Sequence, residues 1–185
     1  MPHPSPCPDP PHRGPLELLL LRHAKSDWSV PVPDHDRPLS PRGRRAARAM
    51  GQHLAGRQPR VELVLCSTAR RARETVELAL QGWSPPPPVV LLDELYLASA
   101  QDILEQVRGV DQRLRCVLVC GHNPALHDMA TLLAGRGDPH ELAELAERLP
   151  TGSLVSIELA GGWGEVAFAA GRLVGLLTPR GLQAG

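Results

Sequence analysis

The chain has 185 residues, enough for one domain that buries roughly two thirds of the surface its unfolded chain exposes. Its 20 basic and 20 acidic residues cancel, so the charge balance indicates neither a nucleic-acid partner nor an anionic membrane. No run of about 18 apolar residues occurs, which argues against a transmembrane helix.

The two ends of the chain and its cysteines indicate where the folded domain lies and in which compartment the protein works. Residues 1–14 are rich in proline, lack the apolar segment of a signal peptide, and are expected to form a disordered tail. One domain is expected over residues 15–178, followed by a short flexible tail at 179–185. The four cysteines show neither disulfide nor zinc-ligand spacing, which favours a reduced, cytoplasmic protein.

Short apolar runs alternate with helical patterns through the rest of the chain. The expected strands are 16–21, 61–66, 89–91, 116–120, 154–159 and 165–170. The expected helices are 41–55, 70–80, 100–108, 124–134 and 139–148. The last two strands, separated by the glycine-rich 160–164, are expected to form a hairpin at the edge of the sheet. This alternation predicts a single three-layer α/β domain, with a mostly parallel sheet and helices on both faces.

The first apolar run ends in Arg22 and His23. Ligands of parallel α/β sheets bind at the carboxyl ends of the strands, where these two residues are expected to lie. A histidine in that position can act as a nucleophile or carry a proton, and a neighbouring arginine indicates an anionic substrate.

A second strand-to-helix junction places Arg70, Arg71 and Arg73 in the first turn of a helix, with Ser67 or Thr68 expected as its N-cap. Cations near a helix N-terminus are unfavourable by ~0.3–1 kcal/mol each, because that end carries partial positive charge. A bound oxyanion would offset the repulsion. The alternative is that these arginines only reflect an arginine-rich composition.

A third junction places His122 after an apolar strand, with Asn123 expected as N-cap and Pro124 in the first helical position. By itself such a histidine could be structural. Together, however, the three junctions bring two histidines and several arginines to one edge of the sheet. That set suits phosphoryl transfer to a histidine, because neutral imidazole is nucleophilic and cationic groups can stabilise the transferred oxygens.

Four segments resemble motifs of the histidine phosphatase (phosphoglycerate mutase-like) superfamily, and in particular its SixA-type phosphohistidine phosphatase branch. They are 21–26 (Leu-Arg-His-Ala-Lys-Ser), 36–43 (Asp-Arg-Pro-Leu-Ser-Pro-Arg-Gly), 67–75 and 121–124 (Gly-His-Asn-Pro). The resemblance covers about residues 16–159, with the motifs in family order. It implies a phosphoglycerate-mutase-like fold and a phosphatase that needs neither metal nor cofactor.

The same resemblance implies a role for each matching residue. His23 would be the nucleophile that becomes phosphohistidine, and Arg22, Arg71 and His122 would hold the phosphate. Arg37 is expected to line the pocket as well. Its alternative is a surface ion pair with one of the aspartates at 34 and 36.

The possible substrates differ in whether their leaving group needs a proton donor. Larger members of the superfamily use a glutamate as proton donor, and Glu94 lies at a similar place, although it could also sit on a solvated loop. Imidazole leaves readily, whereas an ester needs a donor. The chain also lacks long insertions around the site, so an open pocket that accepts phosphohistidine on a phosphorylated protein is favoured. A small sugar or nucleotide phosphate ester and a non-catalytic phosphate-binding module are the alternatives.

Overall fold

The computed structural model describes residues 14–181. Apart from Gly14, the tail expected at 1–14 lies outside the described residues, as do residues 182–185 of the tail expected at 179–185. Within the described chain, no helix combines the length and the apolar character needed to span a bilayer.

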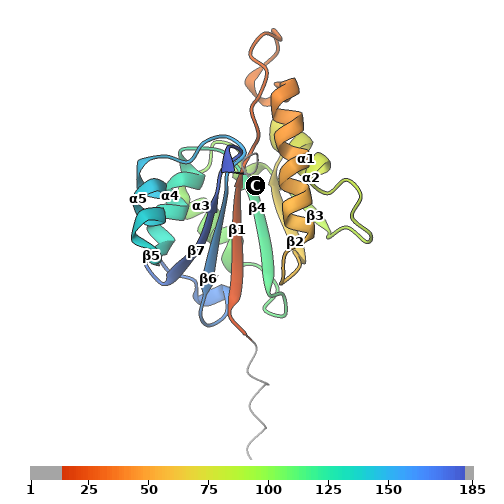
Figure 1. Cartoon of the computed structure of the whole chain (residues 1–185). Helices are drawn as coiled ribbons and strands as arrows, with labels where there is room; N and C mark the ends of the chain where they lie inside the picture. The colour runs from red at the N-terminus through yellow and green to blue at the C-terminus, as the bar shows by residue number, and fades with distance from the viewer. Residues whose placement is uncertain (1–13, 182–185) are drawn as a thin grey trace, which may run out of the picture.

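Seven strands of residues 14–181 form one sheet in the order β3-β2-β4-β1-β6-β7-β5 (Figure 1). They are β1 (Leu16–Arg22), β2 (Leu63–Ser67), β3 (Val89–Leu92), β4 (Cys116–Gly121), β5 (Ala134–Arg136), β6 (Leu154–Leu159) and β7 (Gly171–Leu177). β1 to β4 pair in parallel, and β5 pairs in parallel with β7. Only β6, within this described sheet, runs antiparallel to its neighbours β1 and β7. The expected mostly parallel α/β domain is confirmed.

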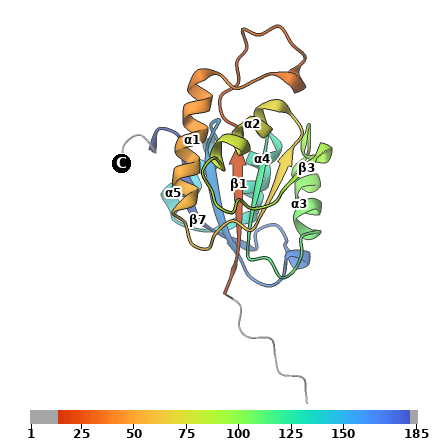
Figure 2. The same ribbon diagram turned by 90° about the vertical axis from the view of Figure 1, so that its right-hand side faces the viewer.

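Helices cover both faces of the sheet. They are α1 (Pro41–Ala55), α2 (Arg70–Ala79), α3 (Ala100–Arg108), α4 (Ala125–Leu133) and α5 (Pro139–Glu147). Figure 1 shows α1 and α2 on one side of the sheet and α3, α4 and α5 on the other, and Figure 2 shows α1 and α2 in front of it. Three short 3-10 turns, η1 (Asp34–Asp36), η2 (Asp93–Leu95) and η3 (Trp163–Glu165), complete the elements of the described chain.

The leucines of β1 are buried on both faces because the strand lies between two helical layers. Leu18 and Leu20 belong to the core that contains α3, α4 and α5 side chains. Leu19 and Leu21 point the other way and join the core formed with Met50 of α1 and other residues of α1 and α2. Side chains alternate between the faces of a strand, so a continuous apolar run fits only such a central position.

The expected strand at 165–170 is wrong. The chain after β6 instead forms η3, and β7 begins only at Gly171. Trp163 causes the detour, because its ring is fully buried and its Nε1–H donates to the Leu114 carbonyl at 2.8 Å. β6 and β7 do pair antiparallel as expected, but the unpredicted β5 covers β7 and forms the edge.

The segment between β1 and α1 projects beyond the carboxyl edge of the sheet in both views (Figures 1 and 2). Its base is closed by backbone hydrogen bonds from Asp27 to Pro38 (2.8 Å) and from Ser40 to Lys25 (2.9 Å). α1 then begins directly beneath it, capped by the Ser40 hydroxyl, which accepts from the Gly43 amide at 3.1 Å. The start of α1 therefore supports the residues that follow His23.

Gly43 makes that support possible, since a Cβ added there would lie 2.1 Å from the Lys25 carbonyl oxygen. Alanine normally stabilises a helix interior by roughly 0.5–1 kcal/mol over glycine. Here the clash dominates, so Gly43→Ala should lower the free energy of unfolding by about 1–3 kcal/mol. Gly56→Ala is the matched control, because its Cβ would meet only the His53 carbonyl, at 3.8 Å. Urea unfolding measures both variants, and equal stabilities would contradict the prediction.

Candidate active site

A cavity of about 280 Å³ opens at the carboxyl ends of β1 and β4. Its lining brings together the candidates from all three strand-to-helix junctions: Arg22, His23, Lys25, Ser26, Trp28, Arg37, Arg71, His122, Asn123 and Thr151. A larger hollow of about 480 Å³ lies at the opposite end of β1, beside Glu17 and Glu158, and none of the residues 14–181 that line it is a histidine or a cysteine. We therefore take the smaller cavity, which holds the candidate histidines and arginines, as the candidate active site.

His23 is held as a neutral ring with one free nitrogen. Its Nδ1 lies 2.8 Å from the Ala24 carbonyl oxygen. A carbonyl can only accept, so Nδ1 carries the proton and Nε2 keeps its lone pair. Burial, followed by the nearby His122, Arg71 and Arg22, lowers the pKa of His23 to about 3, although the Ala24 hydrogen bond opposes the shift. The ring is therefore uncharged and nucleophilic at neutral pH.

The second histidine faces the first. The ring centroids of His23 and His122 are 4.9 Å apart, because β1 and β4 are adjacent and end in register at Arg22 and Gly121. His122 Nε2 lies 2.8 Å from the Ser67 hydroxyl, while its Nδ1 is buried with no hydrogen-bond partner among the described residues. Burial and then Arg71 lower the pKa of His122 to about 4, with Asp34 opposing.

Arg22 and Asn123 are anchored by one carbonyl group. Arg22 Nη1 donates to the Leu149 carbonyl at 2.6 Å, and the Asn123 amide donates to the same oxygen at 3.1 Å. Asn123 was expected to cap α4, but Pro124 occupies the N-cap and the helix begins at Ala125. The asparagine side chain instead ties the cavity wall to the segment before β6.

Asp34 holds the two most deeply buried arginines of the cavity. Its carboxylate pairs with Arg37, and its Oδ2 lies 3.0 Å from Arg71 Nη2. Arg71 Nη1 also donates to the Asp34 carbonyl at 2.7 Å. Tyr96 completes the cluster by donating its hydroxyl to Asp34 Oδ2 at 3.0 Å. Burial opposes ionisation, but Arg71, Tyr96 and Arg37 outweigh it and lower the pKa of Asp34.

Arg37 is therefore both a cavity residue and the ion-pair partner of Asp34. It is only 8% exposed, because the Trp28 ring covers its guanidinium group, with the Arg37 Cζ 3.3 Å from the ring centroid. Trp28 itself is 71% exposed and stands at the mouth of the cavity. The two interpretations of Arg37 are compatible, because the same side chain lines the cavity and forms an ion pair with Asp34.

Known proteins resemble this chain in sequence and in fold. The family model of the histidine phosphatase superfamily (branch 1) matches residues 18–96. An uncharacterized protein of Mycobacterium tuberculosis is 38% identical over 162 residues, covering 86% of this chain and all of that protein.

Among solved structures, a SixA protein of Nakamurella multipartitia, described as a candidate phosphohistidine phosphatase, superposes with a TM-score of 0.80 and 33% identity over 90% of this chain and 98% of that one. The chain belongs to the histidine phosphatase superfamily. A similarly described SixA protein of Agrobacterium tumefaciens superposes with a TM-score of 0.75 at 28% identity, covering 89% of this chain and 99% of that one. Within the superfamily, this histidine phosphatase is of the SixA type, and its phosphoglycerate-mutase-like fold is the expected one.

In this histidine phosphatase the three arginines of α2 lie in three different environments. Arg71 lines the cavity, whereas Arg70 pairs with Glu74 on the surface at 2.8 Å. Arg73 lines a different hollow, beside Val76 and Pro86. The helix also lacks the expected N-cap, because Ala69 occupies that position and Ser67 turns to His122 instead.

Glu94 is not brought to the site. It lies exposed in η2 and is absent from the cavity lining. Tyr96, two residues further on, does approach, with its ring centroid 5.9 Å from that of His122. The sequence did not predict the roles of Tyr96, of Asp34 as a bridge, or of Ser67 as the partner of His122. Ser67 begins one of the motif segments, but these roles depend on contacts between residues more than 30 positions apart.

The site can be tested by histidine titration without substrate. Because both rings have a lowered pKa, His23 and His122 should stay neutral as the pH falls from 8 to about 5, and His23 should carry its proton on Nδ1. Long-range ¹H–¹⁵N spectra report the tautomer and charge of each ring, with His23→Gln and His122→Gln for assignment. Protonation of His23 at pH 6 would contradict the prediction.

Proposed function

We propose that this protein removes phosphate from phosphohistidine in proteins through a covalent phosphohistidine on His23. The observation that carries the proposal is the neutral His23 ring, whose unprotonated Nε2 belongs to a cavity lined by three arginines. A neutral nucleophile among fixed cations suits attack on a dianionic phosphoryl group, because the cations attract the substrate while the nucleophile keeps its lone pair.

The first step transfers the phosphoryl group to the enzyme. The lone pair of His23 Nε2 forms a bond to phosphorus as the bond from phosphorus to the substrate ring breaks. That electron pair leaves with the substrate ring, which carries a proton on its other nitrogen and therefore departs as neutral imidazole. In the second step a water oxygen attacks phosphorus, the bond to His23 Nε2 breaks, and inorganic phosphate is released with both protons of the water. The nitrogen regains its lone pair, so the enzyme returns to its initial state.

Arg22, Arg37 and Arg71 would stabilise the equatorial oxygens of the transferring group. Their guanidinium groups are already fixed by Leu149, Asp34 and Trp28, so little reorganisation is needed when substrate binds. Because these cations supply the positive charge, the proposed reaction requires no metal or cofactor. Residues 14–181 contain no group of three His, Cys, Asp or Glu side chains that could hold a metal ion.

His122 would donate a hydrogen bond to the same phosphoryl group. The Ala69 amide donates to the Ser67 hydroxyl oxygen at 3.3 Å, which leaves the hydroxyl proton for His122 Nε2. The neutral His122 ring then carries its proton on the unpartnered Nδ1. A bound dianion favours the charged form of the ring, so the pKa of His122 should rise when phosphate enters.

The leaving group favours phosphohistidine over a phosphate ester. A phosphohistidine ring that is protonated on its other nitrogen releases neutral imidazole, whose conjugate acid has a pKa near neutrality, so it leaves without a strong acid beside it. An ester oxygen needs a proton donor, and the exposed Glu94 does not line the cavity. Three buried free cysteines fit a reducing compartment, and we place the protein in the cytoplasm as part of the proposal.

The decisive experiment compares phosphate release from a phosphohistidine-bearing protein and from an aryl phosphate. Wild type should hydrolyse the phosphohistidine, and His23→Ala should retain less than a few per cent of the rate because no other nucleophile occupies its place. Glu94→Gln should leave this turnover unchanged. Turnover of the aryl ester alone, together with a Glu94→Gln loss restricted to esters with poor leaving groups, would favour the ester alternative. Phosphate binding with no hydrolysis of either would favour the binding module.

Two neighbouring arginines provide a matched pair. Arg71→Ala removes a cavity cation and should cost about 2.7–4 kcal/mol of transition-state stabilisation, roughly a 100- to 1,000-fold loss in kcat. Arg70→Ala removes the same charge one residue earlier, at the exposed ion pair with Glu74, and should change kcat less than about threefold. Steady-state kinetics distinguishes them, and equal losses would show that Arg71 acts only through net charge.

A further inference from the structure

A second hollow adjoins the catalytic cavity. It has a volume of about 400 Å³ and is lined by Arg42, Glu144, Arg148, Pro150, Thr151, Thr178, Pro179 and Arg180. Thr151 also lines the catalytic cavity, so the two spaces meet at this residue. We call the second space the arginine groove, after Arg42, Arg148 and Arg180.

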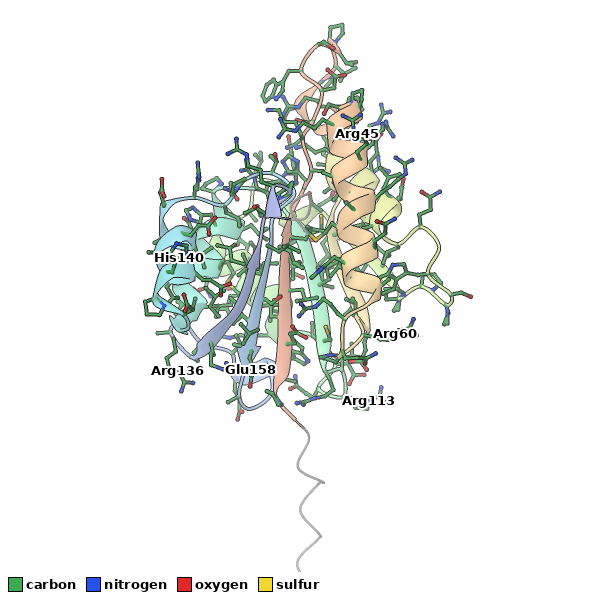
Figure 3. The ribbon with its side chains drawn as sticks, in the orientation of Figure 1. Arg45, Arg60, Arg113, Arg136, His140 and Glu158 are labelled. Atoms are coloured by element: carbon green, nitrogen blue, oxygen red, sulfur yellow. The ribbon has the colours of Figure 1, made fainter. Side chains whose placement is uncertain are left out.

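The topology brings the three arginines to the catalytic end of the sheet from separate parts of the chain. Arg42 lies in the first turn of α1, and Arg148 directly follows α5. Arg180 comes after β7, which runs parallel to β1 because both are antiparallel to β6. By contrast, Arg60 and Arg113 lie at the opposite end of the molecule, as Figure 3 shows.

The groove carries unbalanced positive charge. Arg42, Arg148 and Arg180 are all exposed, and the ion pairs among residues 14–181 include none of them. Glu144 is the one carboxylate in the lining given for the groove by the described residues. Among the other exposed arginines of residues 14–181, Arg113 and Arg172 have carboxylate partners, whereas Arg60 and Arg136 do not. What distinguishes the groove is that three unpaired guanidinium groups line one hollow beside the active site, in a chain with no net charge.

We propose that the arginine groove binds an acidic segment of the phosphorylated protein, next to the phosphohistidine that enters the catalytic cavity. The inference rests on the proposed function, and it names the chemistry of the substrate. The groove begins where the cavity ends, so a chain continuing from the phosphorylated side chain passes directly over it. Its arginines are exposed and come from three separate parts of the chain, which fits an extended carboxylate-bearing segment better than a small ligand enclosed on all sides.

The binding would act mainly through charge. Exposed arginines facing a run of Asp and Glu contribute steering and selectivity more than tight affinity, and salt screens the attraction. The effect should appear in kcat/KM for a protein or peptide substrate and vanish for a substrate that fills only the catalytic cavity.

Two phosphohistidine peptides of equal length test the proposal, one with four glutamates flanking the phosphohistidine and one with four glutamines. Wild type should give a kcat/KM about tenfold higher for the glutamate peptide in 0.05 M NaCl. The triple variant Arg42→Gln, Arg148→Gln, Arg180→Gln should reduce that ratio to about two or less, with aryl phosphate turnover unchanged. Raising the salt to 0.5 M should reduce the wild-type ratio in the same way.

The matched control removes three exposed arginines from the other end of the molecule. Arg60, Arg113 and Arg136, seen there in Figure 3, are changed together to glutamine, which alters the net charge equally. This control should keep the wild-type preference for the glutamate peptide. Equal loss in both triple variants would overturn the proposal, because net charge rather than the groove would then be responsible.

A binding measurement tests this proposal independently of the proposed phosphatase function. Fluorescence anisotropy of the two peptides without phosphate measures the groove even if neither phosphopeptide is hydrolysed. Tighter binding of the glutamate peptide by wild type, lost in the groove variant, supports the inference by itself. Equal binding of the two peptides by wild type would overturn it. Groove-dependent binding to phosphatidylserine vesicles in preference to the glutamate peptide would also overturn it.

Discussion

Burial of β1 on both faces is the constraint on which the site depends. A buried leucine contributes about 1.5–3 kcal/mol, and β1 contributes leucines to the cores on both sides of the sheet. A shift by one residue would exchange the two faces and separate the buried Glu17 from Arg57, with which it forms an ion pair. The strand is therefore locked between β4 and β6, and Arg22 and His23 must emerge at its carboxyl end. The parallel register with β4 then sets His122 beside His23.

The chemistry at that edge follows from how charge is distributed. Three arginines meet in a small cavity, where Asp34 stabilises two of them from the side while Trp28 covers one. Burial lowers the pKa values of both histidines, and the surrounding arginines add to the shift. The arginines therefore attract an anionic substrate and also help burial to keep the nucleophile unprotonated before the substrate arrives. The arginine groove extends the positive surface beyond the cavity.

Several features of the fold and the site were predictable because their causes are local. The leucine run of β1, the proline at the start of α1 and the motif around His122 each act within a few residues, and the structure has these elements where they were expected. The predictions that were wrong concern places where a contact with a residue far along the chain determines the local structure. Trp163 reaches Leu114 and delays the last strand. Ser67 bonds His122 rather than capping α2, and Asn123 bonds Leu149 rather than capping α4.

By itself the sequence determined the α/β class and the positions of the helices and of most strands. Hydrophobic periodicity carries that information, and the resemblance of short motifs to a known family pointed to His23, Arg22, Arg71 and His122 as the candidate site. Only the tertiary structure decided that Asp34 bridges Arg71 to Arg37 and that Glu94 stays outside the cavity. It also brought Arg42, Arg148 and Arg180 together beside the site. These outcomes depend on which direction a side chain takes and on pairs far apart in the chain, which spacing along a sequence does not specify.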